Sequence, residues 1–393
     1  MTGWVSSDLL DRVRERLAGS DADLTPAVIA DALRTEAGGV LGDGDLLGAL
    51  HLLDTEFRGA GVLDALLREP GVTDVLVTGP KQVWVDRGSG LRRAGVSFAD
   101  EASVRRLAQR LALSAGRRLD DAQPWVDGRL PGIDRDSFGV RLHAVLSPVA
   151  QGGTCLSLRV LRPASQGLSA LAATGAFAPG SDKLLRRIVS ARLAFLVVGG
   201  TGTGKTTLLA ALLGEVDATE RIICVEDAAE LAPAHPHVVQ LVARPPNVEG
   251  VGHVGVRDLV RQALRMRPDR IVVGEVRGAE VVDLLTALNT GHDGGAGTVH
   301  ANSPEEVPAR LEALAALGGM DREALHSQLA AAVQVVLHTA RTSAGNRVLA
   351  SIGVLRRDER GVCTVVDAWS RADPVGPGSA ALETLLRRRE GSA

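Results

Sequence analysis

The chain has 393 residues, 45% hydrophobic and 23% charged, which is enough for two or three domains with sizeable cores. This composition excludes a chain disordered throughout, and the formal net charge of −3 argues against a generally basic nucleic-acid-binding protein. The odd number of cysteines, Cys155, Cys224 and Cys363, argues against a disulfide framework or a zinc site. Because no apolar run approaches 18 residues and the N-terminus lacks a signal-peptide pattern, we expect a soluble cytoplasmic protein.

The first 162 residues predict a helical segment followed by a small α+β domain. Apolar residues at three- and four-residue spacing predict helices over 8–17, 26–35 and 45–58. Short β-rich runs over 72–98, broken by Gly-Pro and Gly-Ser-Gly, predict two or three antiparallel strands. A helix over about 101–115 and further strands within 138–162 follow. We therefore expect a helical segment at 1–60 and an α+β domain at 61–162.

The segment 163–180 is rich in Pro, Gly, Ser and Ala, and we interpret it as a linker; the alternative is a surface loop with a short helix. A helix (182–191) then leads into the apolar run LAFLVVGG, which is typical of a strand buried on both faces. Helices and apolar runs alternate beyond it, at 206–214, 222–225, 257–267, 271–274 and 279–290. This rhythm predicts a parallel sheet covered by helices.

The last part of the chain predicts two helices, over about 305–316 and 321–333. A β hairpin over 334–356, turning at TSAGN, and a short strand at 362–366 follow. We therefore expect an α/β domain over 181–370 and a flexible tail over 371–393.

The strongest chemical signal is GGTGTGKTT (199–207), which fits the pattern G-x-x-x-x-G-K-[ST]. Glycines at Gly200, Gly202 and Gly204 let backbone N–H groups turn inward around a phosphate, and the following helix points its positive end at the anion. Lys205 would reach the terminal phosphates, and the Thr206 hydroxyl would ligate Mg²⁺. The whole nucleotide-binding loop comprises Gly200, Thr201, Gly202, Thr203, Gly204, Lys205, Thr206 and Thr207. The motif and its strand–loop–helix context predict ATP or GTP binding.

A nucleotide-hydrolysing site also needs carboxylates to hold Mg²⁺ or to orient water. Glu226 and Asp227 follow one predicted strand, and Glu275 follows another, where Gly274 occupies the position of the usual aspartate. The carboxyl ends of parallel strands meet at one edge of a sheet, which is where the phosphate loop lies. The alternative for each is an exposed loop acid, and that alternative is strongest for Glu230.

Histidines and arginines supply further candidates. His292 and His300 lie in the glycine-rich stretch TGHDGGAGTVHAN (290–302), which indicates a backbone that approaches another group closely. Arginines at four-residue spacing in 257–267 form either a solvated face or a face toward an anion or a subunit. The sequence leaves open which arginine acts on a phosphate: Arg141, Arg159, Arg244, Arg257 or Arg277.

Taken together, these motifs resemble the type II/type IV secretion ATPases, in particular the branch that drives tight-adherence (Flp-type) pilus assembly. The resemblance covers about residues 60–355. In the C-terminal half it rests on GGTGTGKTTLLAAL (199–212), VEDAAEL (225–231), RPPNVEG (244–250), LRMRPDRIVVGEVRGAE (264–280) and TGHDGGAGTVHANSP (290–304). In the N-terminal half it rests on VTDVLVTGP (72–80), GRRLDDAQPWVDGRLP (116–131) and LSLRVLRP (156–163).

The resemblance implies a fold and a set of roles. It implies a RecA-like P-loop domain with a parallel-rich sheet, preceded by a smaller α+β domain, in a hexameric ring that binds Mg·ATP between the domains. Glu275 would be the general base, Glu226 and Asp227 would position Mg²⁺ and water, and His292 and His300 would sense the γ-phosphate. Arg141 and Arg159 would reach the nucleotide from the N-terminal domain. We also expect Arg277 to be a catalytic residue, together with Lys205, Glu226, Glu275 and His300.

The partner implied by the resemblance is an inner-membrane platform protein that extracts pilin or exports a substrate, with the ring at the cytoplasmic face of the membrane. Two departures weaken the N-terminal correspondence: the long stretch PGIDRDSFG (131–139), and His143 where relatives often have Asn. Two other functions remain open. One is a conjugation or DNA-uptake ATPase, although direct contact with nucleic acid is disfavoured by the charge and by the 2% aromatic content. The other is a non-catalytic assembly protein that binds a nucleotide.

Overall fold

The computed structural model describes residues 9, 12–13, 16–17, 26–38, 42–57, 59–88, 90–130, 139–247 and 249–391. It contains two compact units, residues 1–161 and 162–393, which we call the N-terminal and C-terminal units. The division follows Leu161, one residue before the boundary that the composition suggested. Among the described residues, no helix is both long and apolar enough to cross a membrane.

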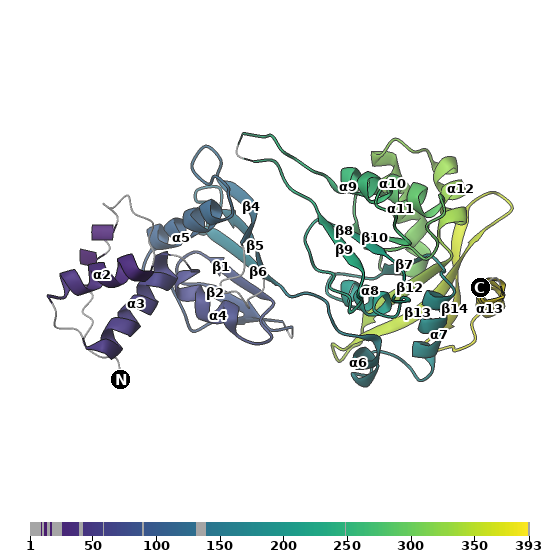
Figure 1. The fold of residues 1–393 in the computed structure, drawn as a ribbon, viewed down its shortest axis with the longest axis horizontal. Coiled ribbons are helices and arrows are strands. Elements are labelled where there is room, and N and C mark those ends of the chain that lie inside the picture. Colours follow the sequence, from purple (N-terminus) through teal and green to yellow (C-terminus); the bar gives the residue numbers. More distant parts are fainter. Residues whose placement is uncertain are drawn as a thin grey trace. The chain divides into compact units, whose positions relative to one another are not determined.

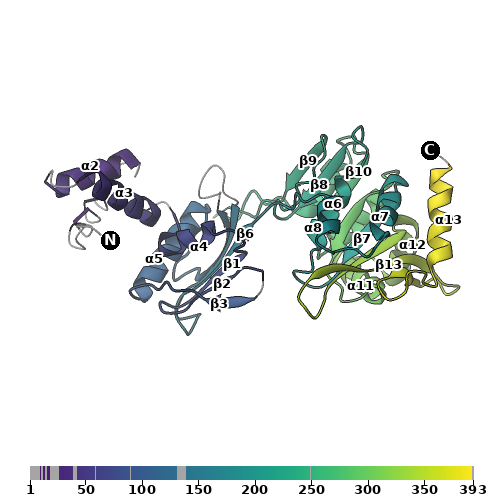
Figure 2. The same cartoon turned by 90° about the horizontal axis from the view of Figure 1, so that it is seen from below.

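The N-terminal unit is built on a six-stranded antiparallel sheet in the order β3-β2-β1-β6-β5-β4 (Figures 1 and 2). Its strands are β1 (Asp74–Thr78), β2 (Val83–Asp86), β3 (Leu91–Arg93), β4 (Trp125–Leu130), β5 (Gly139–Val145) and β6 (Cys155–Leu161). Alternate residues such as Val75, Val77 and Leu158 point into the core, where they meet Val104 and Leu111 of helix α5 (Glu101–Ser114). The other face of the sheet carries the polar residues of the alternation.

Short helices complete this unit. The 3-10 helix η1 (Gly61–Leu63) and α4 (Asp64–Arg68) contribute Leu63, Leu66 and Leu67 to the core of the sheet. Helices α2 (Pro26–Glu36) and α3 (Asp43–Phe57) have an apolar cluster of their own, which confirms the two helices predicted there. Most of the helix predicted over 8–17 lies outside the described residues, as does most of the stretch 131–139.

The C-terminal unit contains an eight-stranded sheet in the order β14-β13-β12-β7-β11-β10-β8-β9. The strands are β7 (Phe195–Val198), β8 (Ile222–Glu226), β9 (Val238–Val242), β10 (Arg270–Val276), β11 (Ala296–Val299), β12 (Val335–Arg341), β13 (Arg347–Arg357) and β14 (Cys363–Ser370). Pairing is parallel from β12 through β9 and antiparallel from β12 to β14. The parallel-rich α/β sheet predicted from the alternating rhythm is confirmed.

Helices cover both faces of this sheet, as the unbroken apolar run of β7 predicts. Phe195 and Val197 of β7 belong to one apolar cluster, and Leu196 and Val198 belong to another. The first cluster includes α6 (Leu168–Ala173), α7 (Ser181–Ser190), α8 (Lys205–Leu213) and α13 (Ser379–Glu390). The second includes α9 (Val256–Ala263), α10 (Glu280–Leu288), α11 (Val307–Leu317) and α12 (Arg322–Ala332), with η2 (Pro304–Glu306) before α11.

Two segments differ from the expectation. The segment 163–180, expected as a linker, includes α6, whose Leu168 and Leu171 are buried in the C-terminal unit. The segment 371–393, expected as a flexible tail, includes α13, whose Leu382 and Leu386 are buried in the same core. In both segments a few leucines at helical spacing find an apolar surface that the local composition does not reveal.

Candidate functional site

The phosphate loop joins β7 to α8, where the sequence placed it. Gly199 adopts a φ of 152°, and a Cβ there would collide with the carbonyl oxygen of Thr339 on β12. Gly202 and Gly204 have φ values of 72° and 96°, in the left-handed region that favours glycine. Residues 199–204 therefore form a tight backbone turn that leads into the first turn of α8, a geometry suited to binding an anion.

Lys205 lies inside this loop and is only 7% exposed. Its Nζ donates to the carbonyl oxygens of Gly199 at 3.0 Å and Gly200 at 2.9 Å, and it lies 3.4 Å from Nδ1 of His300. Burial lowers the pKa of the Lys205 ammonium, and the negative charge of Glu275 opposes that shift. The only buried lysine ammonium of the described chain thus lies where a phosphate would bind.

An array of charged side chains crosses the carboxyl edge of the sheet next to the loop. The strands β7, β11, β10 and β8 are neighbours, so the residues at their ends come together. His300, just after β11, has its Nε2 at 2.8 Å from Oε1 of Glu275 on β10. Arg277 follows β10 and pairs with Asp227 after β8, while its Nη1 lies 3.9 Å from Oε2 of Glu275. We call Lys205, His300, Glu275, Arg277 and Asp227 the edge array.

The hydrogen bonds of the edge array define the state of His300. An ammonium has only hydrogens to donate, so Nδ1 of His300 accepts from Lys205. The ring is then the Nε2–H tautomer, which donates to the carboxylate of Glu275. The imidazole therefore connects the cation of the phosphate loop to the predicted general base.

Glu226 ends β8 but is turned into the protein and is 3% exposed. Its Oε1 accepts hydrogen bonds from the backbone N–H groups of Glu230 at 3.0 Å and Leu231 at 2.9 Å. These bonds hold the loop that follows β8. In this arrangement Glu226 stabilises the loop after β8, whereas Asp227 is part of the edge array.

His292 and His300 lie at opposite ends of β11. His300 follows the strand at the phosphate-loop edge, whereas His292 precedes it and hydrogen-bonds through Nδ1 to the carbonyl oxygen of Ala287, at 3.0 Å. Within the C-terminal unit the structure therefore does not bring the two predicted histidines together.

The arginines of α9 are held by an acid in the same unit. Arg257 and Arg261 both pair with Asp283 of α10, at 2.6 and 2.9 Å. Arg244 donates to the carbonyl oxygen of Gly252 at 2.9 Å. Of the arginines in this unit that the sequence singled out, Arg277 alone joins the edge array.

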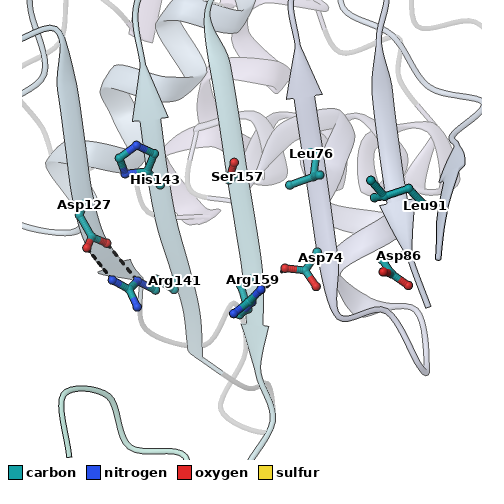
Figure 3. Close-up of a pocket in the computed structure, with 9 residues that line it drawn as sticks. All are labelled: Asp74, Leu76, Asp86, Leu91, Asp127, Arg141, His143, Ser157 and Arg159. Atoms are coloured by element: carbon teal, nitrogen blue, oxygen red, sulfur yellow. Dashed lines mark hydrogen bonds and ion pairs between the residues drawn. The ribbon is translucent and has the colours of Figure 1, made fainter. Parts of the chain in front are cut away.

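Arg141 and Arg159 lie side by side on the polar face of the N-terminal sheet, opposite each other on β5 and β6. Figure 3 shows them with Asp127 and Asp74, their ion-pair partners at 2.7 and 2.9 Å. They line a shallow cavity of about 510 Å³ over all six strands of the sheet, with Leu91 contributed by β3. Trp84 and Trp125 stand on the same face, Trp125 with 56% exposure. This face, with its two arginines paired to aspartates, is a second candidate site.

Side chains that the sequence reasoning missed come from the β12–β13 hairpin. Thr339 bonds through Oγ1 to the Val198 carbonyl oxygen, at 3.1 Å, and lies 2.9 Å from Oγ1 of Thr203. Arg341 donates from Nε to the carbonyl oxygen of Gly202 at 3.2 Å. These residues are about 140 positions from the loop and belong to no motif, so only the position of β12 beside β7 reveals them.

A nucleotide and Mg²⁺ can be tested against these residues. The glycines with positive φ leave room that a Cβ would fill, and Lys205 supplies the cation. Across the described ranges, no three His, Cys, Asp or Glu side chains gather as a metal cluster. Magnesium at a nucleotide is commonly held by one or two oxygens of the protein and by the phosphates, so Thr206 and Asp227 fit that pattern.

A parallel α/β sheet with this loop, its buried lysine and carboxylates at the neighbouring strand ends defines a P-loop nucleoside-triphosphate-binding fold. The chain belongs to the family described as type II/IV secretion system protein, whose family model matches residues 56–363.

Related proteins agree with this family assignment, and solved structures share the fold. The chain is 69% identical over 350 residues to a Mycobacterium tuberculosis (H37Rv) protein named "Putative conjugal transfer protein", covering 89% of this chain and 99% of the relative. It is 34% identical over 270 residues to a type IV secretion system protein PtlH homolog of Bordetella bronchiseptica, covering 62% and 77%. The fold is similar to the Legionella pneumophila ATPase DotB (TM-score 0.53, 20% identity, 79% and 81% covered). It is also similar to the ADP-bound pilus retraction motor PilT (TM-score 0.52, 21% identity, 84% and 86% covered).

Proposed function

We propose that this protein hydrolyses Mg·ATP and supplies the mechanical work of a secretion or pilus-assembly machine. The observation that carries the proposal is the edge array. Lys205, His300 and Glu275 form a continuous chain of contacts that runs from the phosphate loop after β7, past the end of β11, to an acid on β10. A glycine-rich turn that served only packing would need neither the buried lysine nor this chain.

Each member of the array has a role that follows from its position. Lys205 binds the terminal phosphates in place of the two loop carbonyls that it now contacts. Glu275 accepts the proton of the attacking water, and the Nε2–H of His300 orients its carboxylate. Arg277 is held near both Glu275 and Asp227, so it can neutralise charge that develops during phosphoryl transfer.

Magnesium neutralises the charge of the phosphates when it is bound. The Thr206 hydroxyl, in the first turn of α8, and the Asp227 carboxylate would hold it together with the nucleotide. Glu226 supports this site indirectly, because its bonds to Glu230 and Leu231 fix the segment that begins with Asp227.

Membership in the secretion family supports a proposal for the machine and its partners. We propose a homo-hexameric ring that works at the cytoplasmic face of the inner membrane through a platform protein, as in tight-adherence pilus assembly. In that ring Arg141 and Arg159 of the N-terminal sheet would close on the nucleotide. The paired aspartates Asp74 and Asp127 would release these arginines when phosphates compete for them.

A second candidate is the ATPase of a conjugation or DNA-uptake apparatus. The name of the mycobacterial relative, which is 69% identical, favours it. The net charge of −3 disfavours direct contact with DNA. The two candidates therefore differ in whether single-stranded DNA changes the rate of hydrolysis.

The first experiment measures Mg·ATP hydrolysis by the purified chain and by Lys205→Ala, Glu275→Gln and Glu323→Gln, with and without single-stranded DNA. Glu323 is an exposed acid at the start of α12 and serves as the matched control. We expect Lys205→Ala to lose nucleotide binding. We expect Glu275→Gln to keep binding and to lose hydrolysis by about 10²–10⁴-fold, the range of general base catalysis.

Indifference to DNA supports the secretion motor, whereas strong stimulation favours the conjugation or DNA-uptake ATPase. Hydrolysis by Glu275→Gln at the rate of Glu323→Gln would refute the role of Glu275. Tight ATP binding by the wild-type hexamer without hydrolysis, in the presence of its membrane partner, would leave a structural nucleotide and end the motor proposal.

A further inference from the structure

The β12–β13 hairpin covers one flank of the phosphate loop. In the sheet, β7 lies between β12 and β11, so the loop after β7 has the hairpin on one side and His300 on the other. Thr339 touches the start of the loop at Gly199 and its middle at Thr203. The hairpin therefore packs against the side of the phosphate loop that is opposite the edge array.

Two arginines lie where the strands of the hairpin meet its turn: Arg341 is the last residue of β12 and Arg347 is the first residue of β13. Arg341 and Arg347 are directly opposite each other in the β12–β13 register. Arg341 donates to the Gly202 carbonyl oxygen at 3.2 Å, and Cδ of Arg347 lies 3.4 Å from the place that a Cβ would take at Gly204. Both side chains thus border the half of the loop that leads into α8.

The charge of this pair is not balanced nearby. Among the residues that the structure describes, no carboxylate lies within ion-pair distance of Arg341 or Arg347, although like charges on opposite strand positions are destabilising. Both arginines are exposed at the surface; partial loss of solvent lowers the pKa of the Arg347 guanidinium, and the charge of Arg341 lowers it further. The arginines of α9, by contrast, share Asp283. A like-charged pair beside an anion-binding loop favours an anionic ligand.

Arg341 also fixes the orientation of a loop peptide. The carbonyl of Gly202 and the N–H of Thr203 belong to one planar trans peptide and point in opposite directions. Because the guanidinium of Arg341 binds that carbonyl from the hairpin side, the N–H of Thr203 points away from the guanidinium.

The arrangement also indicates which phosphate is near the pair. Glu275 and His300 stand on the β11 side of the loop, where the terminal phosphate must lie for water to attack it. A phosphate chain that crossed the loop would then have its α-phosphate on the hairpin side. We propose that Arg347 binds the α-phosphate of the nucleotide and that Arg341 is a positioning residue for the 202–203 peptide. This inference rests on the proposed function.

The test compares Arg347→Gln, Arg341→Gln and Arg356→Gln in the full-length protein. Arg356 is an exposed arginine at the far end of β13 and is the matched control. Dissociation constants for ADP and ATP are measured by calorimetry with Mg²⁺, and melting temperatures are measured without nucleotide. We expect Arg347→Gln to weaken ADP and ATP equally, by about tenfold, the scale of one charge-assisted hydrogen bond. Its melting temperature without nucleotide should be unchanged or higher, because repulsion is removed.

Arg341→Gln should raise KM and leave kcat within about threefold, because the loop peptide contributes equally to binding of substrate and transition state. Its melting temperature without nucleotide should also be unchanged or higher, because the same repulsion is removed. A fall in melting temperature of several degrees in either variant would show that the pair supports the fold, and would overturn the inference.

Other outcomes also decide the matter. Wild-type affinity in Arg347→Gln, or a loss for ATP alone, would overturn the assignment to the α-phosphate. If the wild-type protein binds neither nucleotide, the proposed function itself fails. If the wild type binds both, Lys205→Ala does not, and Arg347→Gln behaves as Arg356→Gln, then only this inference fails.

Discussion

Position 274 requires a glycine because the side chain of Glu226, 48 residues earlier in the chain, lies directly beside it. A Cβ at Gly274 would lie 2.7 Å from Cγ of Glu226, whose carboxylate is buried and bonded to the backbone of the following loop. The space for an aspartate at the end of β10 is therefore filled from β8. Glu275, on the opposite face of the strand, is left as the acid that can meet His300.

We expect Gly274→Ala to destabilise the C-terminal unit by about 1–3 kcal/mol, the usual cost of overpacking a core. The added methyl would push Glu226 off the N–H groups of Glu230 and Leu231, so ATP hydrolysis should fall as well. Chemical denaturation and a hydrolysis assay measure the two effects. Gly95→Ala, where nothing lies within 4 Å of the added Cβ, is the control. Equal stability of the two variants would contradict the packing argument.

Single residues of the site were predictable where a motif fixes their chemistry. The pattern around Lys205 and the acid after an apolar strand predicted Lys205 and Glu275, which the structure joins through His300. The same reasoning treated Glu226 as a ligand, because a sequence does not show which way the last side chain of a strand turns. Their catalytic roles remain predictions.

At the scale of elements, apolar periodicity predicted most helices and the buried strands of the sheet. It missed β9, whose residues are only partly buried, and β11, where the small residues of AGTV resemble a loop. Gly297 on β11 has Leu284 of α10 and a β10 carbonyl close to the place of its Cβ. The glycine that weakened the strand prediction is thus required by close packing.

Helix α13 is held by leucines and by charges at three points. Leu382 and Leu386 are buried, Arg187 of α7 pairs with Glu383 and Glu390, and Arg389 pairs with Asp293 at 2.7 Å. Asp293 belongs to the loop before β11, next to His292. Helix α13 is therefore part of the C-terminal unit, and its ion pair with Asp293 stabilises the loop that contains His292.

Leu386→Ala should lower the free energy of unfolding by about 2–5 kcal/mol, because Leu386 is fully buried. Thr384→Ala, an exposed position on the same helix, should change it by less than about 0.5 kcal/mol. Urea denaturation of both variants makes the comparison. A Leu386→Ala protein as stable as Thr384→Ala would mean that α13 contributes little to the fold.

At the scale of the whole molecule, the two units carry different halves of the proposed chemistry. The phosphate loop and the edge array belong to the C-terminal unit, whereas Arg141 and Arg159 belong to the sheet of the N-terminal unit. The sequence predicted both halves. How they cooperate depends on an arrangement between units that local patterns do not encode.

If the N-terminal arginines close on the nucleotide, Arg159→Gln should reduce hydrolysis by at least about tenfold, the loss of one charge-assisted contact to a phosphate. Its stability should change by less than about 1 kcal/mol, since its ion pair with Asp74 is exposed on the Arg159 side. Steady-state kinetics and thermal melting test this expectation. Arg92→Gln, an exposed change on β3 of the same sheet, is the control. Normal turnover by Arg159→Gln would remove this residue from the site.

The placement of the indole rings gives the molecule built-in optical reporters. The chain has no tyrosine and four tryptophans, so its ultraviolet emission comes from indole alone. Trp369 is 7% exposed inside the C-terminal unit, whereas Trp125 is 56% exposed on the open face of the N-terminal sheet. A red shift on denaturation is therefore expected from Trp369 of the C-terminal unit and, in smaller part, from the half-buried Trp84 of the N-terminal unit, because Trp125 already emits in water. Quenching by iodide, which cannot enter a core, instead selects exposed indoles such as Trp125, so a single unlabelled sample can distinguish the open face of the N-terminal sheet from the buried Trp369.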